Sequence, residues 1–126
     1  MREILFRGKT YDGKWEQGDL RHKGYVHNDS DTYIMRSDYA LHNIPVDPET
    51  VGQYIGLTDK NGQKIFEGDI VDILTENEEI GVITYDEGGF VVKADGFCVD
   101  FHNNINGTDL EVIGSIHDNP ELLKGE

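Results

Sequence analysis

Fifteen glycines divide this chain of 126 residues into short segments, and this spacing leaves little room for long helices. Between the glycines, residue types recur at every second position, as where Val51, Gln53, Ile55 and Leu57 alternate with Gly52, Tyr54 and Gly56. Alternation of this kind is the period of a half-buried β-strand. The Asp-Gly pair at 12–13 and the Asn-Gly pair at 61–62 are strong hairpin signals. The sequence therefore predicts a mainly β protein.

The predicted strands share this alternation and end at turn residues. They cover residues 1–8, 15–20, 32–35, 51–57, 64–66, 70–74, 80–85, 90–94, 96–101 and 110–116. Asp47 before Pro48 fits an N-cap followed by proline at the first helical position, which predicts one helical turn. Asn119 is the expected N-cap of a second short helix, which would pack through Leu122 and Leu123.

The length and the strand pattern predict a single domain, 1–126, with two lobes. Residues 1–57 are expected to form an N-terminal β or mixed lobe. Residues 58–118 offer several short strands joined by tight turns, which is typical of a small SH3-like β-barrel closed so that few edges stay open. Residues 119–126 complete the chain as a short helix and tail.

The formal net charge of −14 lies almost entirely in the second part of the chain. Residues 1–50 carry seven Lys or Arg and nine Asp or Glu, a net −2, whereas residues 51–126 carry four and sixteen, a net −12. Such a field repels phosphate backbones, so direct nucleic-acid binding is disfavoured. Solubility is one interpretation of the charge, and an acidic surface that mimics DNA is the alternative.

A hydrophobic content of 37% and an aromatic content of 10% indicate a folded chain. The single cysteine, Cys98, leaves no internal disulfide, and its place in an alternating stretch favours a buried thiol. The apolar run near the N-terminus is far shorter than that of a signal peptide, and no segment is long enough to cross a bilayer. We expect a cytoplasmic protein. A homo-oligomer is a further alternative, because exposed edge strands can pair with a second subunit.

The sequence contains no recognisable catalytic, cofactor or metal motif. Its five histidines form no zinc-binding spacing. Cys98 and His102 would share a strand face but stand about 13 Å apart at ~3.3 Å per residue, too far for a nucleophile and its base. No catalytic residue, cofactor or metal ligand is therefore predicted. A hydrolase or metal enzyme with a site assembled only by the fold stays an open alternative.

Aromatic side chains in the less acidic half are the best remaining functional signal. They are interleaved with Lys and Arg, a composition found both at protein interfaces and on surfaces that bind single strands. The candidate interaction surface consists of Tyr11, Trp15, Tyr25, Tyr33 and Tyr39.

Three stretches in this order resemble the YopX-like family, which is encoded mostly by phages and prophages. They are REILFRGK at 2–9, VGQYIGLTDKNGQKIFEGDIV at 51–71 and VIGSIHDNPELL at 112–123. The resemblance spans nearly the whole chain and implies a phage-related context, but it carries over no activity, catalytic residue or cofactor. Much of the middle stretch has an architectural interpretation, because its glycines suit turns and bulges and Asp59 and Asp69 can accept backbone N–H groups.

These observations favour a non-enzymatic module that binds a host or phage protein. A nucleic-acid-associated protein or DNA mimic is the second hypothesis, and an unrecognised hydrolase or metal-dependent enzyme is the third.

Overall fold

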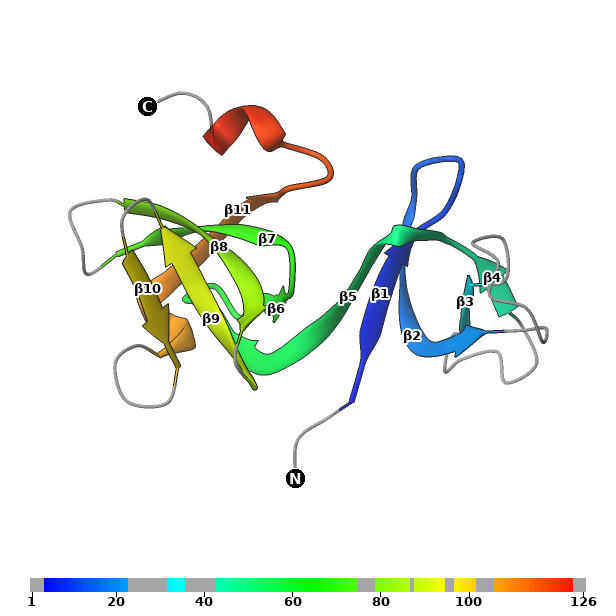
Figure 1. Cartoon of the computed structure of the whole chain (residues 1–126), viewed down its shortest axis with the longest axis horizontal. Helices are drawn as coiled ribbons and strands as arrows, with labels where there is room; N and C mark the ends of the chain where they lie inside the picture. Colours follow the sequence, from blue (N-terminus) through cyan, green and yellow to red (C-terminus); the bar gives the residue numbers. More distant parts are fainter. Residues whose placement is uncertain are drawn as a thin grey trace. The chain divides into compact units, whose positions relative to one another are not determined.

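The computed structural model describes residues 4–22, 32–35, 43–74, 79–86, 88–94, 97–101 and 106–123. The chain folds into two compact units, residues 1–54 and residues 55–126 (Figure 1). The boundary between them lies inside one long strand, β5, which spans Asp47–Thr58. Within the described residues the fold is mainly β, as the sequence predicts.

The first unit is built from antiparallel strands. They are β1 (Phe6–Lys9), β2 (Trp15–His22), β3 (Thr32–Met35), β4 (Asn43–Pro45) and the first part of β5. The order across the sheet is β4-β3-β2-β1-β5-β6, where β6 (Lys64–Phe66) already belongs to the second unit.

Side chains of Ile34, Val46 and Tyr54 are buried in the first unit. Gly8 on β1 allows Val46 to pack closely, because a Cβ at Gly8 would lie 2.8 Å from a Val46 methyl carbon. Such a contact is shorter than real Cβ atoms tolerate, so the close packing here requires glycine.

The second unit contains a five-stranded antiparallel sheet in the order β10-β9-β8-β7-β11 (Figure 1). Its strands are β7 (Asp69–Ile73), β8 (Glu79–Asp86), β9 (Gly89–Ala94), β10 (Phe97–Asp100) and β11 (Leu110–Ser115). Two 3-10 turns accompany them, η2 (Gly107–Asp109) and η3 (Pro120–Leu123). The core of this unit is formed by Ile55, Ile65, Val71, Ile73, Ile83, Val92 and Leu110.

The predicted SH3-like barrel is not confirmed, since the sheet is open in the part of the chain that the structure describes. There, β10 pairs with β9, and β11 pairs with β7. The outer edge of β11 is occupied by other groups: the Val112 N–H donates to Asp59 Oδ2 at 2.9 Å, and the Ser115 N–H donates to Asn119 Oδ1 at 3.2 Å. Side-chain oxygens therefore accept the backbone N–H groups that a neighbouring strand would bind in a closed barrel.

The predicted helical turn at Asp47 and Pro48 is wrong, because these residues begin β5. A local bond of the kind expected for a cap does form, from the Glu49 N–H to Asp47 Oδ1 at 3.1 Å. The backbone nevertheless stays extended, since Asp47 pairs with Lys9 at an irregularity in the β1–β5 register. Proline is tolerated at such an irregularity, where no ladder N–H is needed.

Both ends of the chain also differ from the prediction. The first strand begins at Phe6, and Ile4 before it is 68% exposed. The segment after β11 forms one 3-10 turn, Pro120–Leu123, and the expected terminal helix is not confirmed. In that turn Leu122 is half-buried and Leu123 is 40% exposed. Leu123 therefore packs less than the sequence predicts.

Candidate functional site

The turn between β1 and β2 presents an exposed aromatic side chain on an ordered backbone. Tyr11 is 65% exposed at this turn, which extends beyond the two strands (Figure 1). The Thr10 N–H donates to the Lys14 carbonyl oxygen at 2.8 Å, and the Gly13 N–H donates to the Thr10 carbonyl oxygen at 3.0 Å. Gly13 has φ of +93°, a left-handed conformation that glycine adopts without strain. The Asp-Gly hairpin signal is thus confirmed.

Side chains add to the order of this turn. The Thr10 hydroxyl accepts from the Lys14 N–H at 2.9 Å and donates to Asp12 Oδ1. The hydrogen bond from the Thr10 hydroxyl lowers the pKa of Asp12 below its usual value; desolvation opposes this, and the positive charge of Lys14 adds to the lowering. Asp12 therefore stays ionised at neutral pH and holds the Thr10 side chain in place.

At the base of the hairpin, two cations lie over the ring of Trp15. The Arg7 guanidinium carbon is 4.3 Å from the ring centroid, and Lys9 Nζ is 5.6 Å from it. Arg7 and Lys9 are two residues apart on β1, and Trp15 is the pairing partner of Lys9 on β2, so all three side chains share one face. These distances are those of cation–π interactions, which compensate in part for the burial of Arg7.

The remaining predicted aromatic residues are divided between described and undescribed parts of the chain. Tyr33 lies on β3 beside Arg21 of β2 and is half-buried. Tyr25 and Tyr39 lie outside the described residues. The structure therefore brings Tyr11 and Trp15 to one hairpin and locates Tyr33 two strands from β1.

The sequence analysis did not select Arg7 and Lys9, although both lie over the Trp15 ring. A signal for them existed in the sequence. The Asp-Gly turn at 12–13 fixes the hairpin register, and that register brings Lys9 opposite Trp15. We call Lys9, Tyr11, Lys14 and Trp15 the hairpin surface; Arg7 contacts the Trp15 ring but is itself buried.

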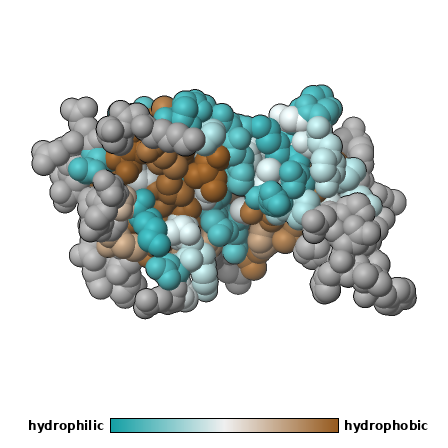
Figure 2. All heavy atoms as spheres, turned by 45° about the horizontal axis from the view of Figure 1, so that its top comes forward, coloured by the Kyte–Doolittle hydropathy of each residue, from teal (hydrophilic) through white to brown (hydrophobic). Residues whose placement is uncertain are grey.

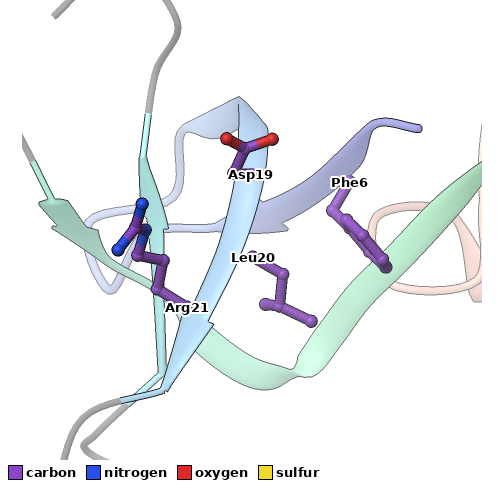
Figure 3. Close-up of a pocket in the computed structure, with 4 residues that line it drawn as sticks. All are labelled: Phe6, Asp19, Leu20 and Arg21. Carbon is purple, nitrogen blue, oxygen red and sulfur yellow. The ribbon is translucent and has the colours of Figure 1, made fainter. Parts of the chain in front are cut away.

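A shallow, open depression of about 480 Å³ lies on the same unit (Figure 3). It is lined by Phe6 of β1 and by Asp19, Leu20 and Arg21 of β2. In Figure 3, the Phe6 and Leu20 side chains lie on the same side of β2, whereas Asp19 and Arg21 point elsewhere. The depression thus combines two apolar side chains with one acid and one base, and it adds an apolar area to the first unit.

The two aspartates of the middle sequence stretch have structural partners, as predicted. Asp59 Oδ1 accepts from the Asn61 and Gln63 N–H groups, both at 2.9 Å, and Asp69 Oδ2 accepts from the Phe66 N–H at 2.8 Å. Both side chains are buried. Their contacts hold turns together in the second unit.

The described residues contain no group of three or more His, Cys, Asp or Glu placed to hold a metal ion. Cys98 lies exposed on β10, so the expected burial of its thiol is wrong. In the described ranges no helix is long and apolar enough to cross a membrane.

Comparisons with known proteins identify relatives of the whole chain. A family model described as YopX protein matches residues 5–124. The crystal structure of protein EF1440 from Enterococcus faecalis is similar, with 27% sequence identity and a TM-score of 0.54. That similarity covers 98% of this chain and 99% of EF1440. No curated protein matches the chain significantly.

Proposed function

Since this chain belongs to the YopX protein family, we propose that it is a non-enzymatic binding module that engages a phage or host protein through the hairpin surface. The observation that carries the proposal is Tyr11, which is 65% exposed on a turn that backbone and side-chain hydrogen bonds already order. On an ordered backbone, a tyrosine has only two side-chain torsions to fix, so it loses little conformational entropy when a partner binds.

The neighbouring side chains support a protein partner. Trp15 and Lys9 are half-buried and lie in cation–π contact, and tryptophan and tyrosine are enriched at binding hot spots. Lys14 is exposed in the same turn as Tyr11 and would favour an acidic or polar rim on the partner. The side chains of Phe6 and Leu20 in the depression alternate with Arg7 and Trp15 along β1 and β2, so they lie on the other face of this strand pair and are not part of the hairpin surface.

A partner capture experiment with a matched variant tests this proposal. The full chain and its Tyr11→Ala variant would be used to retain proteins from phage-infected cells, and the retained protein would be purified and titrated. We expect Tyr11→Ala to bind at least about tenfold more weakly, as for the loss of a hot-spot residue. Tyr85→Ala is the control, since Tyr85 is an exposed tyrosine of the second unit, and it should bind like the wild type. Equal binding by all three proteins contradicts the proposal.

Association with nucleic acid is the competing proposal and makes a different prediction. Direct binding of single strands by aromatic and basic residues would weaken steeply as salt is added. A DNA mimic would ignore DNA and would instead bind a DNA-binding protein through acidic groups. A mobility shift with single-stranded DNA at low salt that is lost in Tyr11→Ala favours nucleic acid over a protein partner.

A further inference from the structure

We propose that the second unit carries a separate docking surface, which takes an amphipathic, basic segment of a partner protein. The surface consists of Ile113, Ile116 and Leu123, and we call it the β11 patch. This surface lies in the acidic unit and uses none of the residues of the hairpin surface.

The three aliphatic side chains of the β11 patch are 37%, 38% and 40% exposed. Ile113 stands at the irregularity between Val112 and Gly114, where β11 shifts register against β7. A bulge of this kind turns an extra side chain outward from the regular ladder. Figure 2 shows an area of apolar surface on the unit formed by residues 55–126, the unit to which β11 and η3 belong.

Hydrogen bonds hold the segment that carries the patch in a defined conformation. The Asn119 N–H donates to the Ser115 carbonyl oxygen at 2.8 Å, and Asn119 Oδ1 accepts from the Ser115 N–H at 3.2 Å. Asn119 thereby ties the η3 turn, which carries Leu123, to the end of β11. A Cβ at Gly114 would lie 2.6 Å from Asn119 Oδ1, so glycine permits this close approach.

The chain segment that carries the β11 patch is acidic. Residues 106–123 contain four acidic residues and no Lys or Arg. They are Asp109, Glu111, Asp118 and Glu121. Lys60 Nζ lies 3.5 Å from Glu111 Oε1 and forms an ion pair with this acidic residue. A partner that covers the aliphatic side chains therefore gains most if it surrounds its own apolar residues with Lys or Arg.

The same charge argues against other occupants. A second copy of this chain would bring one acidic rim against another, and like charges across an interface cost binding free energy. Nucleic acids and anionic membrane surfaces are repelled by a unit with net charge −12. A basic amphipathic segment is the one class that satisfies both the aliphatic centre and the acidic rim.

The test uses two synthetic helical peptides that share one leucine stripe, with either lysines or glutamates on the polar face. Each peptide carries a fluorophore and is titrated with the full-length chain. We expect binding of the lysine peptide and none of the glutamate peptide. The double variant Ile113→Ser with Ile116→Ser should bind the lysine peptide about tenfold more weakly, and Glu121→Lys about threefold more weakly.

Two controls separate this surface from general charge attraction and from the hairpin surface. Tyr85→Ser removes another exposed apolar side chain of the same unit, 56% exposed, and should bind like the wild type. Tyr11→Ala should also bind the peptide unchanged, so the two proposals fail independently. Glu121→Lys keeps the test informative if the double variant unfolds, since Glu121 is exposed.

Three outcomes overturn the inference. The first is the absence of lysine-peptide binding, and the second is equal binding by the wild type, the double variant and Glu121→Lys. The third is a dimer in sedimentation equilibrium that the double variant dissolves, which would make a second copy the occupant of the β11 patch.

Discussion

Asp59 joins two distant parts of the second unit through one carboxylate. One oxygen accepts the N–H groups of Asn61 and Gln63 in the turn after β5, and the other accepts the N–H of Val112 on β11. Burial acts to raise the pKa of Asp59, but these three donors and Lys60 outweigh it and hold the pKa below its usual value. The ionised carboxylate is therefore the form that the fold favours.

We predict that Asp59→Ala destabilises the second unit by about 3 kcal/mol. The substitution leaves three backbone donors without the acceptor that they have in the wild type, and charged acceptors contribute more than neutral ones. Urea unfolding followed by circular dichroism measures the change. Asp86→Ala, at an exposed position on β8, is the control and should lie within about 0.5 kcal/mol of the wild type. A loss no larger than that of the control contradicts this role for Asp59.

The pH dependence of stability follows from the same carboxylate. Because its pKa is lower in the folded chain than in the unfolded chain, its contribution is complete above the unfolded pKa of about 3.9. It is lost as the pH falls through the lower, folded pKa. We expect Asp59→Asn to flatten the decline of unfolding free energy between about pH 5 and pH 2, measured by urea titration at several pH values. If the free energy of unfolding of Asp59→Asn declines with falling pH as in the wild type, other carboxylates control the loss of stability in acid.

Two glycines of the second unit should differ sharply in their tolerance of alanine. A Cβ at Gly107 would lie 2.2 Å from the carbonyl oxygen of Thr58, a backbone atom that cannot rotate away, whereas a Cβ at Gly89 meets nothing within 4 Å. We predict that Gly107→Ala costs about 2 kcal/mol or more, as overpacking against backbone does. Gly89→Ala should stay within about 0.5 kcal/mol. Thermal unfolding of the two variants makes the comparison, and equal melting temperatures would contradict it.

At the scale of elements, β5 shows how strand pairing can overcome a local helix signal. The Lys9 N–H donates to the Thr50 hydroxyl oxygen at 2.8 Å, and that hydroxyl donates to the Asp47 carbonyl oxygen at 2.6 Å. The Thr50 side chain thus bridges β1 to the irregular start of β5. The segment keeps its extended backbone because β1 provides the partner.

We predict that Thr50→Val destabilises the first unit by about 1 to 2 kcal/mol. Valine has a similar volume to threonine, so the substitution removes both hydrogen bonds of the buried hydroxyl and changes the packing little. Fluorescence of Trp15, the single tryptophan of the chain, reports unfolding of this unit. Gln17→Val is the control at an exposed position of β2 in the same unit and should be nearly neutral. If both variants unfold at the same urea concentration, the Thr50 bridge contributes little.

At the scale of the whole molecule, the two units differ most in charge. Residues 1–54 carry seven basic and nine acidic residues, whereas residues 55–126 carry four and sixteen. Self-repulsion among sixteen acidic side chains destabilises the compact state of the second unit, and dissolved salt screens it.

We therefore predict that about 0.5 M NaCl slows amide hydrogen exchange in β7 and β8 more than in β1 and β2, because screening at that concentration is nearly complete beyond a few ångströms. Hydrogen exchange followed by mass spectrometry of proteolytic peptides measures the exchange rates of both units in one sample. Equal slowing in the two units, or greater slowing in the first, contradicts this account of the charge.

The sequence by itself determined most strands of this protein, but not β4 or the first residues of β5. Alternating apolar residues and the Asp-Gly and Asn-Gly pairs act over a few residues, so β3, β6 and the hairpin turn at Gly13 could be predicted from short windows. The local bonds of Asp59 to Asn61 and Gln63 were predictable for the same reason. Of the hairpin surface, the aromatic members Tyr11 and Trp15 could be selected by composition.

Only the tertiary structure decided which distant groups meet. The bond from Val112 to Asp59 joins residues 53 apart in the chain, and the bond from Lys9 to Thr50 joins residues 41 apart. The contact of Arg7 with Trp15 depends on the register of β1 against β2, and the open edge at β10 depends on which strands pair. The bonds from Val112 and from Lys9 each join residues far apart in the chain. Forming them requires that a long loop closes and that side chains of both segments become buried together, so a pattern within one short segment cannot predict them.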